Sequence, residues 1–188
     1  MIKSHDRSYY IGASDTSYVV GNWTTKSFEK WWGEKLGIYS NDFTNVYMQA
    51  GTFLEHRILD ALNIPNLEKD KQIIRGRLRV NLDGNTKDTV YEVKTHGTDK
   101  PFKVSKAYRE QVYIEMYAFG YKKAYIVSYG LTDADYNNFY LPIDLKRLDL
   151  HPIEYNEEFI RDVYIPRFDY LSDCLDKGVF PKWNSQEL

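Results

Sequence analysis

The chain has 188 residues, enough for one domain with a hydrophobic core but short of two typical domains. Its formal net charge of −2 at pH 7 argues against a protein held to nucleic acid mainly by a global positive field, although a local basic groove remains compatible with it. The single cysteine, Cys174, excludes an internal disulfide and a cysteine-ligated metal or iron–sulfur cluster. We therefore expect a single domain over residues 1–188.

Targeting and cofactor signals are missing from the sequence. The first residues lack the apolar core of a signal peptide, and no run of about 18 apolar residues occurs that would span a membrane. There is also no glycine-rich phosphate loop of the Walker type. We expect a soluble, cytoplasmic protein with no membrane partner.

Two short helices are expected near the N-terminus. Ser14 is a candidate N-cap of a first helix that ends at Gly21. Thr24 or Thr25 begins a second helix, which contains two tryptophans and ends at Gly33. We expect the tryptophans to pack in the core rather than to stack on bases.

The longest helical pattern runs from Phe43 to Leu62, with apolar residues at near-helical spacing over about five turns. Gly51 and Glu55 lie four residues apart and so share one side of this helix. Pro65 follows the helix and prevents its continuation. An exposed carboxylate paired with a neighbour is the alternative interpretation of Glu55.

Three strands follow this helix. The second and third are joined by a stretch rich in turn-forming residues, and in the third strand Glu92 and Lys94 share one face because side chains alternate along a strand. The strand segments are Lys71–Ile74, Leu78–Leu82 and Thr89–Thr95.

The register of this hairpin decides whether Asp83 joins Glu92. A tight turn centred on residues 85–86 would place Asp83 opposite Asp88, and Glu92 would then lie about 13 Å away, too far to share a metal ion. A wider loop would place Asp83 opposite Val90, with Glu92 as a diagonal neighbour at about 7 Å. Only the second register brings the two carboxylates to one divalent cation.

Two carboxylates and a lysine in this arrangement suit metal-assisted hydrolysis of a phosphodiester bond. Mg²⁺ prefers carboxylate oxygens and water, and water bound to it is acidic enough to act as a nucleophile. Lys94 would orient or deprotonate that water, or offset charge in the transition state. Taken alone, a Glu-x-Lys segment is more often a solvated surface pair, so the hydrolytic interpretation depends on the surrounding segments.

The remaining elements complete an α/β pattern. A helix is expected over residues 104–119 and closed by Gly120, followed by a strong strand over 122–129 and a weaker edge strand at Phe139–Ile143. A last helix, Asn156–Lys177, is expected to bend at Pro166.

The segment Leu82-Asp83-Gly84, followed after a short gap by Tyr91-Glu92-Val93-Lys94, resembles the Asp…Glu-x-Lys signature of the PD-(D/E)XK nucleases. Within that superfamily it is most similar to the phage lambda exonuclease and related viral recombination nucleases. The resemblance implies an α/β fold with an αβββαβ core, in which helices flank a mixed central sheet, extended by N-terminal helices and by a C-terminal strand and helix.

The resemblance also implies a set of site residues. Asp83, Glu92 and Lys94 would be catalytic, and Mg²⁺, or Mn²⁺ in its place, would be held by Asp83, Glu92 and the backbone carbonyl of Val93. The family directs a glutamate from the long helix toward the metal, which corresponds to Glu55 here.

The resemblance extends to the helix after the hairpin and to Ser14, whereas the other candidate phosphate contacts are basic residues that cluster on both sides of the acidic centre. Gln111 corresponds to a family glutamine and would hold Lys94 or a phosphate, whereas Tyr113 stands where the family has a second glutamine, so its role is open. Each candidate phosphate contact has an alternative as a plain helix cap or a solvated surface group. The candidate DNA phosphate contacts are Ser14, Arg75, Arg77, Lys103 and Arg109.

We expect a metal-dependent deoxyribonuclease, more an exonuclease than an endonuclease, of the 5′ to 3′ phage recombination type. The implied partners are DNA, a single-strand annealing protein and further copies of the chain. One alternative is a DNA-binding or regulatory module that keeps the fold without hydrolysis. Another is an interaction protein whose 17 tyrosines form a partner surface.

Overall fold

The computed structural model describes residues 8–39 and 46–182. These residues form two compact units. The first contains the described residues before 40, residues 73–80 and those from 156 onward, and the second contains residues 46–72 and 81–155. The expected single domain over the whole chain stays a prediction.

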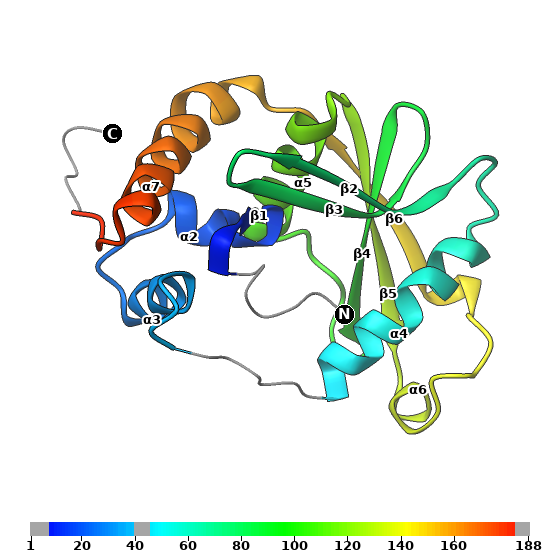
Figure 1. The fold of residues 1–188 in the computed structure, drawn as a ribbon. Coiled ribbons are helices and arrows are strands. Elements are labelled where there is room, and N and C mark those ends of the chain that lie inside the picture. The colour runs from blue at the N-terminus through cyan, green and yellow to red at the C-terminus, as the bar shows by residue number, and fades with distance from the viewer. Residues whose placement is uncertain (1–7, 40–45, 183–188) are drawn as a thin grey trace. The chain divides into compact units, whose positions relative to one another are not determined.

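The first unit is mainly helical (Figure 1). Its strand β1 pairs in parallel with the start of β3, where Ile11 lies beside Leu78. Its elements are β1 (Ile11–Gly12), a 3₁₀ turn (Ala13–Asp15), α2 (Thr16–Val20), α3 (Lys26–Lys35), a π-helix (Phe159–Tyr164) and α7 (Ile165–Lys177).

Aromatic residues form much of the core of the first unit. Phe28 and Trp32 of α3 are buried and stack on each other, and Trp23 stacks on Tyr170 of α7. The expected packing role of the tryptophans is therefore confirmed. Pro166 follows the π-helix directly, and the single long helix expected here is divided at that point into π and α segments.

Two expected helix boundaries in the first unit are wrong. Ser14 lies inside the 3₁₀ turn, and the N-cap position of α2 is occupied by Asp15, whose carboxylate accepts a hydrogen bond from the Gly12 backbone N–H. Gly33 does not end α3, which continues to Lys35; instead, a Cβ at Gly33 would lie 2.4 Å from the Tyr39 ring. Thr25 caps α3 as expected, accepting from the Phe28 N–H.

The second unit contains the long helix, the hairpin and most of the sheet. The expected helix over 43–62 is present as α4, and residues 43–45 lie outside the described residues. The bounds are α4 (Val46–Ala61), β2 (Glu68–Arg75), β3 (Leu78–Asn85), β4 (Thr89–Gly97), α5 (Lys106–Phe119), β5 (Lys123–Leu131), α6 (Asp133–Asn137) and β6 (Leu148–Glu154), with β2 and β3 extending into the first unit.

The sheet of the second unit is mixed. β4 runs antiparallel to β3 and parallel to β5, and β6 is antiparallel to β5. β2 pairs with β3. The order α4, β2, β3, β4, α5, β5 reproduces the expected αβββαβ core, so the predicted fold class is confirmed.

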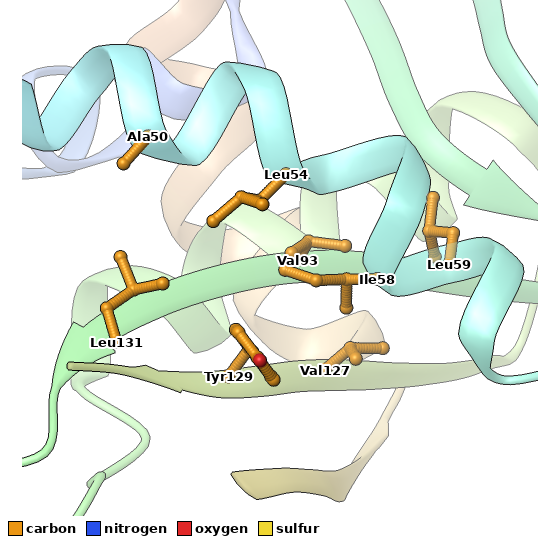
Figure 2. Packing of buried hydrophobic residues seen from close by; sticks show 8 residues of the cluster. All are labelled: Ala50, Leu54, Ile58, Leu59, Val93, Val127, Tyr129 and Leu131. Carbon is orange, nitrogen blue, oxygen red and sulfur yellow. The ribbon is translucent and has the colours of Figure 1, made fainter. Parts of the chain in front are cut away.

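The apolar core of this unit lies between α4 and the sheet. Leu54 and Ile58 of α4 pack against Val93 of β4 and against Val127 and Tyr129 of β5 (Figure 2). Because side chains alternate along β4, the residues on either side of Val93 point to the opposite face of the sheet. That face is covered by α5.

The hairpin register differs from both registers considered above. Gly84 pairs with Tyr91 and Asn85 with Val90, and the Thr86 N–H donates to the Thr89 carbonyl at 2.9 Å, so the turn is tight but centred two residues later than a turn on 85–86. Gly84 is a regular strand residue without positive φ. Its hydrogen side chain instead admits Leu59 of α4, whose Cδ1 would lie 3.1 Å from an added Cβ.

The expected edge strand at residues 139–143 is wrong. Arg57 of α4 donates to the carbonyl oxygens of residues 139–141, so these backbone groups accept side-chain hydrogen bonds and the segment is a loop. The edge strand is β6, which contains Pro152. No helix among residues 8–39 and 46–182 is long and apolar enough to cross a membrane.

Candidate active site

The β3–β4 hairpin brings Asp83 and Glu92 together. The pairing of β3 with β4 covers Gly84–Tyr91 and Asn85–Val90, and Asp83 and Glu92 are the next residue on each strand. The backbone N–H of Val93 donates to Asp83 Oδ2 at 2.8 Å, which holds the carboxylate against β4. The charge of Glu92 also acts on Asp83, so the two acidic residues are neighbours at the end of the paired segment.

Glu92, Lys94 and Gln111 form a hydrogen-bonded triangle between β4 and α5. Lys94 Nζ donates to Glu92 Oε1 at 2.8 Å and to Gln111 Oε1 at 3.1 Å. Gln111 Nε2 donates to the same Glu92 oxygen at 2.6 Å. The structure therefore brings together four of the predicted residues, Asp83, Glu92, Lys94 and Gln111.

Glu115 extends this network and was not among the predicted site residues. It lies one helical turn after Gln111 on α5, is 1% exposed, and accepts a hydrogen bond from Gln111 Nε2 at 2.8 Å. The sequence contains a signal for it, because positions four apart on a helix face the same way and Gln111 and Glu115 share that spacing.

Burial and mutual repulsion raise the pKa of the acidic side chains. For Asp83, burial raises the pKa well above its ordinary value, and the carboxylates of Glu92 and Glu55 raise it further. For Glu115, burial is again the main cause of a strongly raised pKa, followed by the charges of Glu92 and Asp83. The surroundings therefore disfavour the charged forms of both carboxyl groups.

Lys94 is the cation of the network. Burial alone would lower the pKa of Lys94, but the charge and hydrogen bond of Glu92 outweigh burial and raise it above the ordinary value. Lys94 is therefore protonated at neutral pH. Its Nζ also lies 5.0 Å from the centre of the Tyr108 ring.

Glu55 reaches the site from α4. Burial, followed by the charge of Glu92, raises its pKa. Its carboxylate also groups with His56 and Asp70, and one ligand atom from each of these three residues lies within 4.8 Å of the others. Among the described residues, Glu55, Asp83 and Glu92 do not form a group this compact.

The chemistry of the donor set fits a hard divalent cation. Such ions are bound by one or two carboxylates together with water, and a bound cation would offset the repulsion that raises the pKa of Asp83. Asp83 and Glu92 therefore have the character of metal ligands.

The predicted phosphate contacts are divided between the units. Arg77 already has partners within the first unit, because its Nε donates to Asp176 at 2.8 Å and its guanidinium stacks on Tyr9. Lys103 and Arg109 are exposed in the second unit, before and on α5. The remaining two, Ser14 and Arg75, are exposed in the first unit.

Comparisons with known proteins give structural matches only. No protein-family model matches the chain, and no curated protein matches it. An alkaline exonuclease from Laribacter hongkongensis has a TM-score of 0.70 at 19% identity, over 93% of this chain and 92% of that one. The same exonuclease in complex with dAMP has a TM-score of 0.69 at 18% identity, with the same coverage. A phage-related exonuclease from Haemophilus somnus 129PT has a TM-score of 0.65 at 16% identity, over 92% of this chain and 97% of that one.

These likenesses cover nearly the whole chain, and they agree with its mixed α/β architecture of a central sheet flanked by helices. The chain therefore has the fold of the lambda-exonuclease-like PD-(D/E)XK proteins.

Proposed function

We propose that this protein is a metal-dependent deoxyribonuclease that hydrolyses phosphodiester bonds of DNA. The observation that carries the proposal is the convergence of Asp83, Glu92, Lys94 and Gln111 on one hydrogen-bonded site. The solved structures with the same fold support it, because they are exonucleases and one of them is in complex with the nucleotide dAMP.

Mg²⁺, with Mn²⁺ as a substitute, is the proposed metal. Asp83, Glu92 and the backbone carbonyl of Val93 would hold it, with Glu55 assisting. When bound, the ion would supply a more acidic water and charge stabilisation for the phosphate.

Lys94 acts as a donor and a positive charge rather than as a base. Its Nζ donates hydrogen bonds to Glu92 Oε1 and Gln111 Oε1, as an ammonium group with donors only does. Its N–H groups orient the attacking water and offset the charge that develops on the phosphate. Gln111 holds Lys94 through its side-chain oxygen.

We further propose 5′ to 3′ exonuclease action on linear duplex DNA, in phage-type recombination within the cytoplasm. Lys103 and Arg109 contribute phosphate contacts because both are exposed cations next to the site-bearing helix. We also propose phosphate contacts by Ser14 and Arg75, whereas Arg77 is already bound to Asp176. A single-strand annealing protein and further copies of the chain are the proposed protein partners.

The test is a cleavage assay with Mg²⁺ on duplex DNA labelled at either 5′ or 3′ ends, and on nicked and closed circular DNA. Wild-type protein should release nucleotides from the 5′-ended strand of linear DNA and leave closed circles intact. Lys94→Ala should lower kcat by about 10²–10³-fold, the usual effect of removing one group that stabilises developing charge. Lys123→Ala is the matched control, because Lys123 is an exposed lysine on β5 whose nearest charge is Asp88.

Folding and DNA binding are measured in parallel by thermal unfolding and by mobility shift in EDTA. Both should be retained in the Lys94 variant. Unchanged cleavage in folded Lys94→Ala would contradict the proposed mechanism. DNA binding by the wild type without cleavage, and without Mg²⁺ or Mn²⁺ binding at Asp83 and Glu92, would identify a non-hydrolytic DNA-binding module instead.

A further inference from the structure

The side-chain amide of Gln111 is held by three charged or acidic partners. Its Nε2 donates one hydrogen bond to Glu92 Oε1 at 2.6 Å and a second to Glu115 Oε1 at 2.8 Å. Its Oε1 accepts from Lys94 Nζ at 3.1 Å. Both amide protons are therefore used, and the oxygen faces the only ammonium group in the network.

The partners determine which way the amide points. Lys94 can only donate, and an ionised Glu92 can only accept. Rotating the amide by 180° would turn its NH₂ group toward the ammonium and its oxygen toward two carboxyl oxygens. In the observed arrangement Glu115 Oε1 is the acceptor, which requires the Gln111 NH₂ group on that side.

The burial of Glu115 is not explained by packing. The neighbouring residues Ile114 and Met116 are fully buried, as is usual for apolar side chains in a helix that covers a sheet. Glu115 is 1% exposed, and its second oxygen, Oε2, has no hydrogen-bond partner among the described residues. An unsatisfied buried carboxyl oxygen costs stability that an apolar side chain would not, so its benefit must lie elsewhere.

We propose that Glu115 is a positioning residue for the nuclease reaction, which holds Gln111 so that the amide oxygen meets Lys94. The inference rests on the proposed function and adds a residue to it. With Gln111 fixed, Lys94 Nζ is shared between Glu92 and Gln111 rather than drawn fully onto Glu92. The ammonium group then stays where it can act on water and phosphate.

Removing the Glu115 carboxyl group leaves Gln111 Nε2 with one acceptor instead of two. The amide can then rotate, and Lys94 keeps Glu92 as its one remaining fixed acceptor. Reaction rates fall steeply with such displacements, by up to about 10²-fold for a shift of about 1 Å.

The experiment compares Glu115→Leu, Glu115→Gln and the control Glu110→Gln in steady-state cleavage of linear DNA and in thermal unfolding. Glu110 is a buried glutamate on the same helix, but it pairs with Lys106 instead of Gln111. Glu115→Leu should lower kcat by about tenfold to hundredfold with little change in KM, while its Tm is equal to or above that of the wild type. Glu115→Gln retains an acceptor oxygen and should restore kcat to within about threefold, as should Glu110→Gln.

A purely structural role for Glu115 predicts a different pattern. In that case kcat would be lowered only in variants whose Tm is also lowered. Glu115→Gln and Glu115→Leu would then show the same changes in kcat and in KM. Unchanged kcat in folded Glu115→Leu would overturn the inference.

A second readout does not depend on cleavage. In ¹⁵N-labelled protein, the Gln111 side-chain NH₂ signal is assigned by its loss in Gln111→Ala, and its hydrogen exchange is measured. Both protons should exchange slowly in the wild type and in Glu110→Gln, and at least one should exchange fast in Glu115→Leu. If the wild type cleaves no DNA, the proposed function fails, and unchanged exchange in Glu115→Leu would separately refute the positioning role.

Discussion

The two faces of strand β4 differ in chemistry although their residues alternate along one segment of chain. On the α4 side, Val93 packs against Leu54, Ile58 and Val127 in a fully apolar cluster. On the α5 side, Glu92 lies in a buried network of charged and amide groups.

The two faces contribute to the stability of this unit in opposite ways. Burial of the apolar face stabilises the fold, since each large aliphatic side chain contributes about 1.5–3 kcal/mol on leaving water. Burial of the polar face does the opposite, because the raised pKa values of Asp83 and Glu115 mean that their charged forms are disfavoured there. A polar face that opposes stability is expected where a site is built for chemistry.

The largest expected effect comes from Asp83→Asn on the polar face. Asparagine keeps an oxygen that accepts from the Val93 N–H but loses the charge that a metal requires, so cleavage should fall by about 10³-fold or more. Removing a repelled carboxylate should also raise the Tm of the metal-free protein. Calorimetry should show weaker Mg²⁺ binding by the variant. Normal DNA cleavage together with normal Mg²⁺ binding would contradict the proposal that Asp83 is a metal ligand.

The apolar face should show the reverse pattern. Ile58→Ala leaves a cavity in a site that is 0% exposed, and we expect a loss of about 2–5 kcal/mol in the free energy of unfolding. Denaturant titration measures the loss. Activity per folded molecule should stay within about twofold in conditions where the variant is folded, since Ile58 makes no polar contact with the site residues.

The pH dependence of stability should show the contribution of the buried carboxyl groups of Asp83 and Glu115. Because the pKa values of Asp83 and Glu115 are raised in the folded state from ordinary values of 3.8 and 4.5, the folded state binds more protons above those values than the unfolded state. Stability of the metal-free protein should therefore decrease as pH rises from about 4 through the folded pKa values. Melting curves across pH should show this slope, and Asp83→Asn should flatten it; a stability that instead rises over this range would contradict the assignment.

Mg²⁺ should reduce this decrease of stability with rising pH. The ion binds the ionised carboxylates, so its stabilising effect should be larger at pH 8 than at pH 5. Equal stabilisation at both pH values would indicate a metal site away from these carboxylates.

The smallest expected effect lies at the start of the helix that carries Gln111. Ser105 caps α5 by accepting from the Tyr108 N–H at 3.1 Å. Ser105→Ala should cost about 1 kcal/mol of stability. Cleavage at saturating DNA should be unaffected. A large drop in kcat would show that cleavage depends on the exact position of α5 as strongly as on the polar network.

Much of the fold was predictable from local signals. The helix closed by Gly120 was placed correctly because Gly120 adopts a left-handed conformation, with φ of 74°, that suits glycine. The failures came from distant contacts. Arg57 of α4 binds three backbone carbonyls of residues 139–141 and prevents the strand that their aliphatic and aromatic composition favours.

Within the site, the alternation of Glu92 and Lys94 on one face was contained in the sequence, because a strand has a strict period of two residues. The pairing of β3 with β4 was not, because turn-forming residues at 84–88 permit several registers; in the observed register Gly84 lies against Leu59 of α4. The sequence by itself thus determined which residue types could perform the chemistry and the order of the elements that carry them. Only the tertiary structure decided which of them meet, because register, the orientation of Gln111 and the burial of Glu115 all depend on packing between segments far apart in the chain.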